Sequence, residues 1–328
     1  MSLSLTLACQ AYDRVQPILA GDVQIKGVDL TFLDLPVEET FFRMLTNHEF
    51  DVAEMSLSSY VLTLGRDAPF VAVPVFPSRA FRHSGIYVRS DSPWESPQEL
   101  RGARIGVPEY QITAAVWIRG IMQEFYDLPI DSASYYTGGV DQPGRTEKVA
   151  IEAPEGVSIT PIPPTATLSD MLVEGELDAV YSARNPGPFN RRTGQIRRLF
   201  RDPQGEEKSF FDRTGIFPIM HTLVVRRDVY ERNPWVATEL VKAFTRSKDI
   251  TLEKAGETAA LNYALPWAWA ESEELRESFG PDWWPYGVAN NESVLDKFLT
   301  YSHGQGLADR KYAPAELFAP ETLEQVKV

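Results

Sequence analysis

The segment Leu3-Ser4-Leu5-Thr6-Leu7-Ala8-Cys9 alternates apolar and polar side chains, with the two-residue period of a β-strand. A second apolar run, Phe50–Ser56, ends in a polar turn and predicts another strand. Between these runs, residues 28–33 predict a strand, and residues 13–20 and 37–47 predict helices. Strands that alternate with helices indicate an α/β fold with a parallel sheet. Ligands of such sheets bind beyond the carboxyl ends of the strands.

The chain then repeats this alternation, which indicates a second lobe. Residues 70–76 and 85–89 predict two more strands, and residues 90–94 resemble a linker. The elements expected beyond the linker are strands at 103–107, 157–161 and 177–181 and helices at 113–126 and 168–174. This second series repeats the outline of the first.

The length of the chain also favours two lobes, because 328 residues exceed the size at which a single hydrophobic core keeps growing. The apolar run 215–226 predicts a return to the first lobe, and residues 235–260 predict a long helix. We expect the C-terminal helices to cover the first lobe. Lobe 1 is expected to contain residues 1–88 and 222–328, and lobe 2 residues 89–221.

The net charge of −14 argues against a nucleic-acid-binding protein, because contact with phosphate backbones requires a basic face. A small anionic ligand remains compatible with this charge, since salt screens surface charge beyond about 10 Å and local arginines can create a positive pocket. Neither a phosphate-binding glycine loop nor the G-x-S-x-G motif of serine hydrolases occurs in the sequence.

Cys9 is the only cysteine, which excludes an internal disulfide and a cysteine-based zinc site. Leu7-Ala8-Cys9 can mimic a lipoprotein cleavage box, but the apolar stretch before it is short and alternates with polar residues. The start has no basic region typical of a signal peptide. No run approaches the roughly 18 apolar residues of a membrane span. We expect a cytoplasmic protein without membrane contact, and the sequence is compatible with a homo-oligomer.

Three arginines, Arg79, Arg145 and Arg184, each follow an expected strand, where their side chains could reach a ligand cleft between the lobes. Arginine suits carboxylates because its planar fork donates two parallel hydrogen bonds. The alternative is that each is a solvated surface charge. Further polar or aromatic candidates for substrate binding at the strand ends are Ser56, Ser58, Phe76, Tyr110, Gln111 and Thr113.

Two histidines, His83 and His221, lie near the two expected crossings between lobes and would approach one cleft. Histidine titrates near neutral pH and is the commonest general acid or base, although a single histidine is often structural. Glu109 is a third candidate for proton transfer. A metal site made of these three residues is an alternative, but their spacing matches no recognised ligand pattern, so we expect no metal.

Several segments together resemble 4,5-dihydroxyphthalate decarboxylases. The segments that carry this resemblance are Glu54–Ser59, Phe76–Arg79, Arg104–Tyr110, Asp141–Arg145, Gly215–His221, Trp284–Gly287, Tyr301–Gly306 and Glu316–Thr322. The resemblance implies a two-lobed fold like that of type 2 periplasmic binding proteins, in which each lobe is a mostly parallel sheet flanked by helices. It also implies conversion of 4,5-dihydroxyphthalate to protocatechuate and CO2, without an organic cofactor.

The chemistry of such a reaction requires an acid at the ring carbon, a base for the phenol and a cation for the retained carboxylate. We assign His83 or His221 as the acid and Glu109 or the other histidine as the base. The three arginines are assigned to the carboxylates, and Tyr110 or Phe76 to a less cationic wall. The alternatives are a protein that binds or senses an aromatic acid, and an enzyme of the same fold with another substrate.

Overall fold

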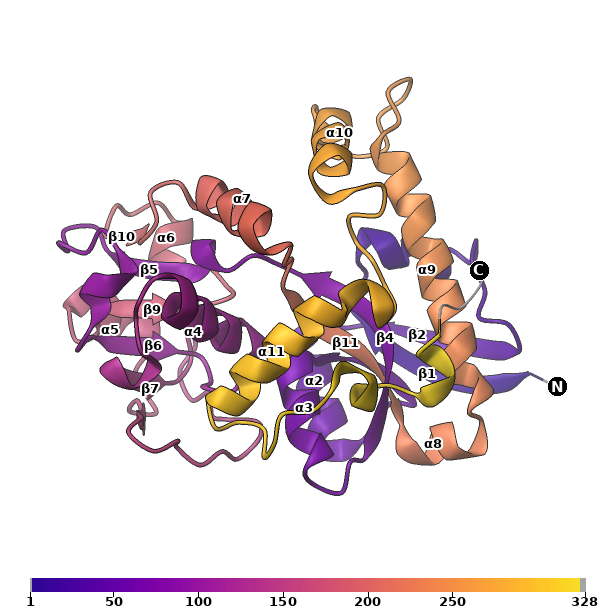
Figure 1. The fold of residues 1–328 in the computed structure, drawn as a ribbon, viewed down its shortest axis with the longest axis horizontal. Helices are drawn as coiled ribbons and strands as arrows, with labels where there is room; N and C mark the ends of the chain where they lie inside the picture. Colours follow the sequence, from indigo (N-terminus) through magenta and orange to yellow (C-terminus); the bar gives the residue numbers. More distant parts are fainter. Residues whose placement is uncertain (1, 325–328) are drawn as a thin grey trace.

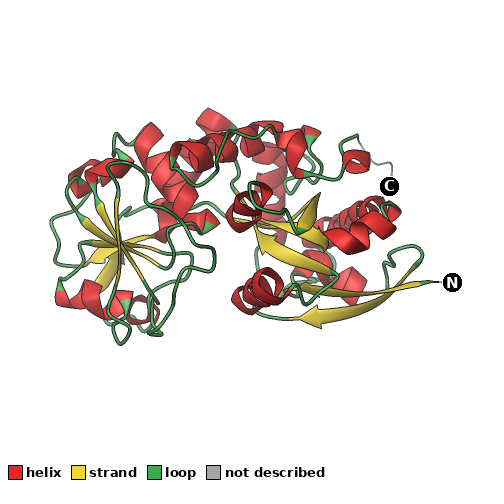
Figure 2. Cartoon of the chain, turned by 90° about the horizontal axis from the view of Figure 1, so that it is seen from below, coloured by secondary structure: helices red, strands yellow, loops and turns green. Residues whose placement is uncertain are grey.

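The computed structural model describes residues 2–324 and has two lobes, each built on one sheet (Figures 1 and 2). The sheet of lobe 1 has the order β2-β1-β3-β11-β4. Its strands are β1 (Leu3–Cys9), β2 (Val28–Asp34), β3 (Val52–Ser56), β4 (Phe70–Arg79) and β11 (Ile219–Arg226). β1 runs parallel to β2 and β3, and β11 lies antiparallel between β3 and β4. The late strand β11 thus inserts into the middle of the first sheet.

The sheet of lobe 2 has the order β10-β5-β9-β6-β7-β8. Its strands are β5 (Ile86–Arg89), β6 (Arg104–Val107), β7 (Ser134–Thr137), β8 (Ser158–Pro161), β9 (Ala179–Tyr181) and β10 (Ile196–Arg198). The four strands β9, β6, β7 and β8 are parallel, and β5 pairs antiparallel with β9 and β10. The α/β fold with mostly parallel sheets is therefore confirmed.

The crossings between the lobes differ by a few residues from the expected division at residues 88 and 222. Because β5 pairs with strands of lobe 2, the first crossing lies between Arg79 and Ile86. The second lies before Ile219, so that Ile219–His221 belong to the lobe 1 sheet. A strand's apolar pattern does not reveal its partners, which here lie about ninety residues or more away along the chain.

Helices flank both sheets (Figure 2). The helices that follow the strands of lobe 1 are α1 (Gln16–Leu19), α2 (Val37–Asn47), α3 (Leu57–Leu64), α8 (Arg227–Arg232), α9 (Trp235–Ala255), α10 (Ala268–Phe279) and α11 (Glu292–Gly304). Those within lobe 2 are α4 (Thr113–Phe125), α5 (Leu168–Glu174), α6 (Gly187–Asn190) and α7 (Pro203–Thr214). The long helix expected from residue 235 was predicted to bury a stripe of Trp235, Val236, Leu240, Ala243 and Phe244; the last four are buried, but Trp235 is 42% exposed. Within residues 2–324, no helix has both the length and the apolar character to cross a membrane.

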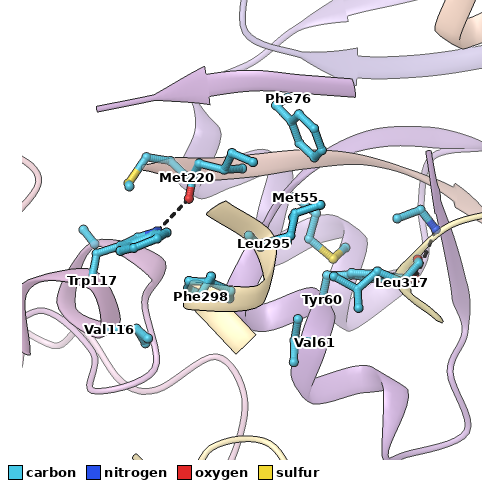
Figure 3. Close-up of a cluster of buried hydrophobic side chains, with 14 of the residues drawn as sticks. Met55, Tyr60, Val61, Phe76, Val116, Trp117, Met220, Leu295, Phe298 and Leu317 are labelled. Atoms are coloured by element: carbon cyan, nitrogen blue, oxygen red, sulfur yellow. Dashed lines mark hydrogen bonds between the residues drawn. The ribbon is translucent and has the colours of Figure 1, made fainter. Parts of the chain in front are cut away.

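The sequence led us to expect that the C-terminal helices cover lobe 1. Helix α11 instead extends from lobe 1 across to lobe 2 (Figure 1). Trp117 of α4 packs against Phe298 and Tyr301 of α11, with both ring centroids 5.6 Å away. The Trp117 indole also donates a 2.9 Å hydrogen bond to the carbonyl of Ile219 in β11 (Figure 3). A hydrophobic core therefore continues from one lobe into the other at this helix.

Candidate functional site

A cavity of about 240 Å³ lies between the lobes. Its lining from lobe 1 and the first crossing includes Gln10, Tyr12, Val37, Glu38, Phe41, Ser56, Ser59, Ser78, Arg82, Met220 and His221, and from lobe 2 Gln111, Ile112, Thr113, Ala114, Arg145, Lys148, Ala183 and Arg184. Many of these residues follow the carboxyl ends of β1, β3, β6 and β9. Parallel strands gather their carboxyl ends at one edge, which is why residues distant in sequence meet here.

On the lobe 1 side, a histidine and a glutamate form a hydrogen-bonded pair. The Nδ1 atom of His221 lies 2.6 Å from Oε1 of Glu54, whose side chain is fully buried. The Tyr12 hydroxyl donates to the same oxygen at 2.8 Å, and the backbone N–H of Gln10 donates to Oε2 at 3.2 Å. The Cys9 thiol lies 3.4 Å from Oε2. These groups fix the orientation of the Glu54 carboxylate.

The environment of this pair keeps Glu54 ionised. Burial alone would raise the pKa of Glu54, but the hydrogen bond and charge of His221 outweigh it, and the pKa is lowered. The edge of the His221 ring packs against Phe41 with 4.9 Å between centroids. The His221 side chain is 16% exposed and lines the cavity. Since Glu54 occupies Nδ1, Nε2 is the ring nitrogen available to a ligand.

On the lobe 2 side, Glu109 anchors two cations that line the cavity. Its side chain is fully buried and forms salt bridges with Lys148 and, at 2.7 Å, with Arg145. The Gln111 amide and the Lys148 backbone N–H each donate to Oε2 at 3.0 Å. Burial opposes ionisation of Glu109, but Lys148 and Arg145 outweigh this effect and lower its pKa. Two positive side chains are thus held in place beside the cavity.

Short hydrogen bonds join the lobes at the cavity. The Ser56 and Thr113 hydroxyls lie 2.9 Å apart, and Thr113 also accepts from the Ser58 backbone at 3.1 Å. The Ser59 hydroxyl donates to the Gln111 side chain at 2.9 Å. Ser56 additionally caps the N-terminus of α3. These contacts fix strand β3 of lobe 1 against helix α4 of lobe 2.

A salt bridge between the lobes also borders the cavity. Arg184 Nε lies 2.6 Å from Glu38 Oε1, and Arg184 Nη2 lies 2.7 Å from Oε2. The two side chains are 66% and 35% exposed. Because α2 carries Glu38 and the segment after β9 carries Arg184, this contact forms only when the lobes are close.

No family model matches the sequence. The sequence is, however, 45% identical to a 4,5-dihydroxyphthalate decarboxylase of Comamonas testosteroni. The 327 aligned residues cover 99% of each chain. The chain belongs to the 4,5-dihydroxyphthalate decarboxylase family. An enzyme of the same name from Pseudomonas putida is 45% identical over 210 residues, which cover 64% of this chain and 81% of that enzyme.

Solved structures show that this decarboxylase family member has the fold of periplasmic binding proteins. The periplasmic aliphatic sulphonate binding protein SsuA of Escherichia coli matches with a TM-score of 0.57 and 12% identity, over 99% of this chain and all of SsuA. The desulfurization enzyme DSZB, in complex with biphenyl-2-sulfinic acid, matches with a TM-score of 0.51 and 16% identity, over 98% of each chain. The fold implied by the sequence resemblance is confirmed.

The two histidines proposed from the sequence occupy different environments in this decarboxylase relative. His83 is fully buried and does not line the cavity. Its ring packs against Tyr126, Phe200 and Phe210, and neither ring nitrogen has a hydrogen-bond partner among residues 2–324. Burial lowers the pKa of His83 to about 4. The structure therefore does not bring His83 and His221 together.

Arg79 also lies outside the cavity. Its guanidinium donates to the Phe217 carbonyl at 2.9 Å and the Pro285 carbonyl at 2.7 Å, and it contacts the Asn291 side chain. Burial lowers the pKa of Arg79 to about 9. These contacts tie the end of β4 to the segment before β11 and to the C-terminal segment. The Arg79 side chain is therefore directed away from the cavity.

Three further sequence candidates lie within the lobes rather than at the cavity. Phe76 packs against Tyr286 and Phe318 in lobe 1. Tyr110 lies beneath the guanidinium of Arg119 at 3.7 Å. The Ser58 side chain is buried, and only its backbone contacts Thr113. In contrast, the candidates that line the cavity are Ser56, Gln111, Thr113, Arg145, Arg184 and His221, while Glu109 lies directly behind two of them.

Four groups at the site were not among the sequence candidates: Tyr12, Arg82 and Lys148, which line the cavity, and Glu54, which lies behind His221. Glu54 could have been found, because a glutamate inside an apolar strand needs a buried partner. Arg82 lies next to the predicted His83; its Nε donates to the Met220 sulfur at 3.1 Å, and burial lowers its pKa to about 10. Nothing in the sequence distinguishes Lys148 from other loop lysines.

The three residues considered as metal ligands in the sequence do not line one cavity, because His83 is buried away from the cavity at which His221 lies. In the part of the chain that the structure describes, no three His, Cys, Asp or Glu side chains gather in a way that could hold a metal ion.

Proposed function

We propose that this protein decarboxylates 4,5-dihydroxyphthalate to 3,4-dihydroxybenzoate (protocatechuate) and CO2. Membership of the decarboxylase family, at 45% identity over 99% of the chain, supports the reaction and the substrate. The observation that carries the chemistry is the Glu54–His221 pair at a cavity whose other side presents Arg145 and Lys148. One side supplies a proton carrier and the other supplies fixed positive charge.

His221 is the proton donor in this proposal. An aryl carboxylate leaves most easily after the ring carbon that bears it has been protonated, because a hydroxyl para to that carbon then stabilises the positive charge. An imidazolium can deliver this proton near neutral pH. The ionised Glu54 at Nδ1 orients the imidazole ring and leaves Nε2 for the ring carbon. The Tyr12 phenol stays protonated, because burial and Glu54 raise its pKa, and it holds Glu54 in place.

Arg145 and Lys148 bind the carboxylate that the product retains. Both are held by Glu109, so little order has to be gained on binding. A cation that gripped the leaving carboxylate equally well would stabilise the ground state and slow the reaction. Phe41 and Met220, which line the cavity beside His221, provide the less cationic wall that we had assigned to Tyr110 or Phe76.

Glu109, which the sequence suggests as a phenol base, is better suited to positioning Arg145 and Lys148. Its two oxygens already receive bonds from Arg145, Lys148 and Gln111, and its pKa is lowered. A carboxylate covered by cations and not in contact with the cavity is a poor acceptor for a substrate proton.

The reaction requires one proton donor and one acceptor, so we propose that it proceeds without an organic cofactor or a metal. We also propose a cytoplasmic location. The support for the latter is that Leu7, Ala8 and Cys9, which mimic a lipoprotein box, are completely buried in β1. Loss of turnover in a chelator would contradict the reaction without a metal. Recovery of the native protein from the periplasm would contradict the cytoplasmic location.

The test is an incubation of the purified protein with 4,5-dihydroxyphthalate in D2O, followed by mass spectrometry of the product. We expect 3,4-dihydroxybenzoate with one deuterium at the ring carbon that lost CO2. Phthalate without hydroxyl groups is the matched control and should remain unchanged, because it has no para oxygen to stabilise the protonated ring. Thermal stabilisation by 4,5-dihydroxyphthalate without any product would contradict the proposal and favour a protein that only binds the ligand.

A further inference from the structure

The proposed reaction leaves one proton without an acceptor. When the ring carbon is protonated, the para hydroxyl becomes acidic and must release its proton. Among the described residues that line the cavity, the only carboxylate is Glu38 and the only imidazole is that of His221. The remaining polar groups there are cations, hydroxyls and amides, which are not bases near neutral pH. Glu38 is therefore the one group left to accept this proton.

The position of Glu38 fits this task. It lies in the first turn of α2, three residues before Phe41. Residues three apart lie on the same helix face, with about 5–6 Å between their Cβ atoms. Phe41 contacts the His221 ring at 4.9 Å. Glu38 and His221 therefore both border the cavity next to Phe41, so one ligand in the cavity can face the carboxylate and the imidazole together.

The charge of Glu38 is also suitable. Partial burial would raise the pKa of Glu38, but the hydrogen bonds and charge of Arg184, with a contribution from Arg145, lower it. The carboxylate is thus ionised when substrate arrives. The Glu38 carboxylate has roughly four lone-pair positions, and the two hydrogen bonds from Arg184 occupy two of them. The others remain for a phenolic hydroxyl.

We propose that Glu38 accepts the phenolic proton of the substrate, and that Arg184 is a positioning residue that aims the Glu38 carboxylate when the lobes close. This inference rests on the proposed decarboxylation. In the first step the His221 proton forms a C–H bond at the ring carbon and the para O–H proton passes to Glu38, which gives a cyclohexadienone. In the second step the C–CO2 bond breaks and its electron pair restores the aromatic ring. The phenolate oxygen formed in this step then takes the proton back from Glu38, and His221 is reprotonated by water.

A carboxylate with a low pKa can perform this step. The hydroxyl of the protonated ring is in effect a protonated ketone, which is far more acidic than a carboxylic acid. The acceptor must only be ionised and correctly placed, and the Arg184 bridge provides both conditions. The same bridge joins the two lobes, so proton acceptance is available only in the closed form.

The test compares Glu38→Gln with Glu39→Gln, which changes the neighbouring glutamate; that side chain is 48% exposed, does not line the cavity and pairs with Arg43. Loss of a general base costs about 10²–10⁴-fold in rate. We expect kcat of Glu38→Gln to fall at least 100-fold with a KM change below 10-fold, and Glu39→Gln to match the wild type. Equal kcat in both variants would overturn the inference.

A charge exchange separates proton acceptance from simple bridging. The double variant Glu38→Arg with Arg184→Glu restores a salt bridge between the lobes but moves the carboxylate to lobe 2. We expect its kcat to remain at least 100-fold below the wild type. Recovery to within about threefold would show that the bridge acts only by closing the lobes and would overturn the inference.

The pH profile gives an independent readout. Because Arg184 lowers the pKa of Glu38, Arg184→Gln should move the acid limb of kcat/KM to higher pH. An acid limb at the wild-type pH would overturn the role of Arg184. Absence of product from the wild-type protein would instead overturn the proposed function and the inference together, so the two failures are distinguishable.

Discussion

Two buried carboxylates lie behind residues that line the cavity between the lobes, and their partners differ in kind. Glu54 in lobe 1 and Glu109 in lobe 2 are both fully buried, and each stays ionised although burial raises its pKa. Glu54 is bonded to an imidazole, a phenol and a backbone N–H, whereas Glu109 is bonded to Arg145, Lys148 and an amide. The residue type and the burial are the same, and only the partners differ.

This difference determines what each lobe can do. An imidazole can carry a proton near neutral pH, so the carboxylate beside it orients a group that can deliver a proton. Arginine and lysine remain charged at that pH, so the carboxylate beside them fixes positive charge in place. Lobe 1 is therefore suited to proton transfer and lobe 2 to holding an anion. The predictions below test this division, beginning with the largest expected effect on turnover.

His221→Asn should abolish most of the turnover. We expect kcat to fall about 10³-fold, because general acid catalysis contributes roughly 10²–10⁴-fold, while 4,5-dihydroxyphthalate still binds to the unchanged lobe 2. Steady-state kinetics and calorimetric titration measure the two effects. His303→Asn, at an exposed histidine at the end of α11, is the control. A kcat within tenfold of the wild type would remove His221 from the mechanism.

Glu109→Gln should weaken both substrate binding and the fold. The change leaves Arg145 and Lys148 without their buried partner, which costs about 3 kcal/mol in the free energy of unfolding. We expect kcat/KM to fall about 100-fold, mainly through KM. Urea denaturation and steady-state kinetics check this, with the exposed Glu176→Gln as the control in lobe 2. A selective loss of kcat with an unchanged KM would show that Glu109 takes part in proton transfer after all.

Lys148→Met should weaken substrate binding without lowering kcat. A charge-assisted hydrogen bond contributes about 1.5–3 kcal/mol, so KM should rise at least 10-fold while kcat stays within threefold. Glu109 retains Arg145, which limits the loss of stability. Lys254→Met, on the exposed C-terminal turn of α9, provides the comparison. If kcat fell more than KM rose, the division of roles between the lobes would be wrong.

The sequence predicts the framework of this site better than its details. Alternating strands and helices predict two sheets, and residues after strand ends, such as Thr113, Arg145 and Arg184, do line the cavity. The Glu54–His221 pair could not be predicted, because it depends on β11 inserting between β3 and β4 and joins residues 167 positions apart. Apolar periodicity identifies a strand but carries no information about its neighbours.

The two histidines show the same limit at the scale of one residue. Both lie near a crossing, His83 after β4 and His221 within β11, and their local sequences give no reason to prefer one. His221 points to the cavity because β11 pairs with β3 there, while His83 turns inward against Phe200 and Phe210 of lobe 2. The packing of α7 against residues 83–85 at the first crossing, which no local pattern encodes, is what separates the structural histidine from the functional one.

His83→Leu should therefore leave turnover within twofold of the wild type and change only the response of the fold to acid. The folded-state pKa of His83 is about 4, against 6.5 for an unfolded histidine, so the unfolded chain binds the proton first as the pH falls. The wild type should lose about 3 kcal/mol of stability from this group between pH 6.5 and pH 4, at 1.36 kcal/mol per pKa unit.

Near pH 8 the group is neutral in both states and contributes no such loss. Removing two unpartnered buried nitrogens should be neutral or slightly stabilising there. Urea denaturation of both proteins at pH 7.5 and pH 4.5 measures the difference, and the variant should lose less stability over that range. If both proteins lose the same amount, or if turnover falls tenfold, then His83 is not the neutral, structural partner in the comparison with His221.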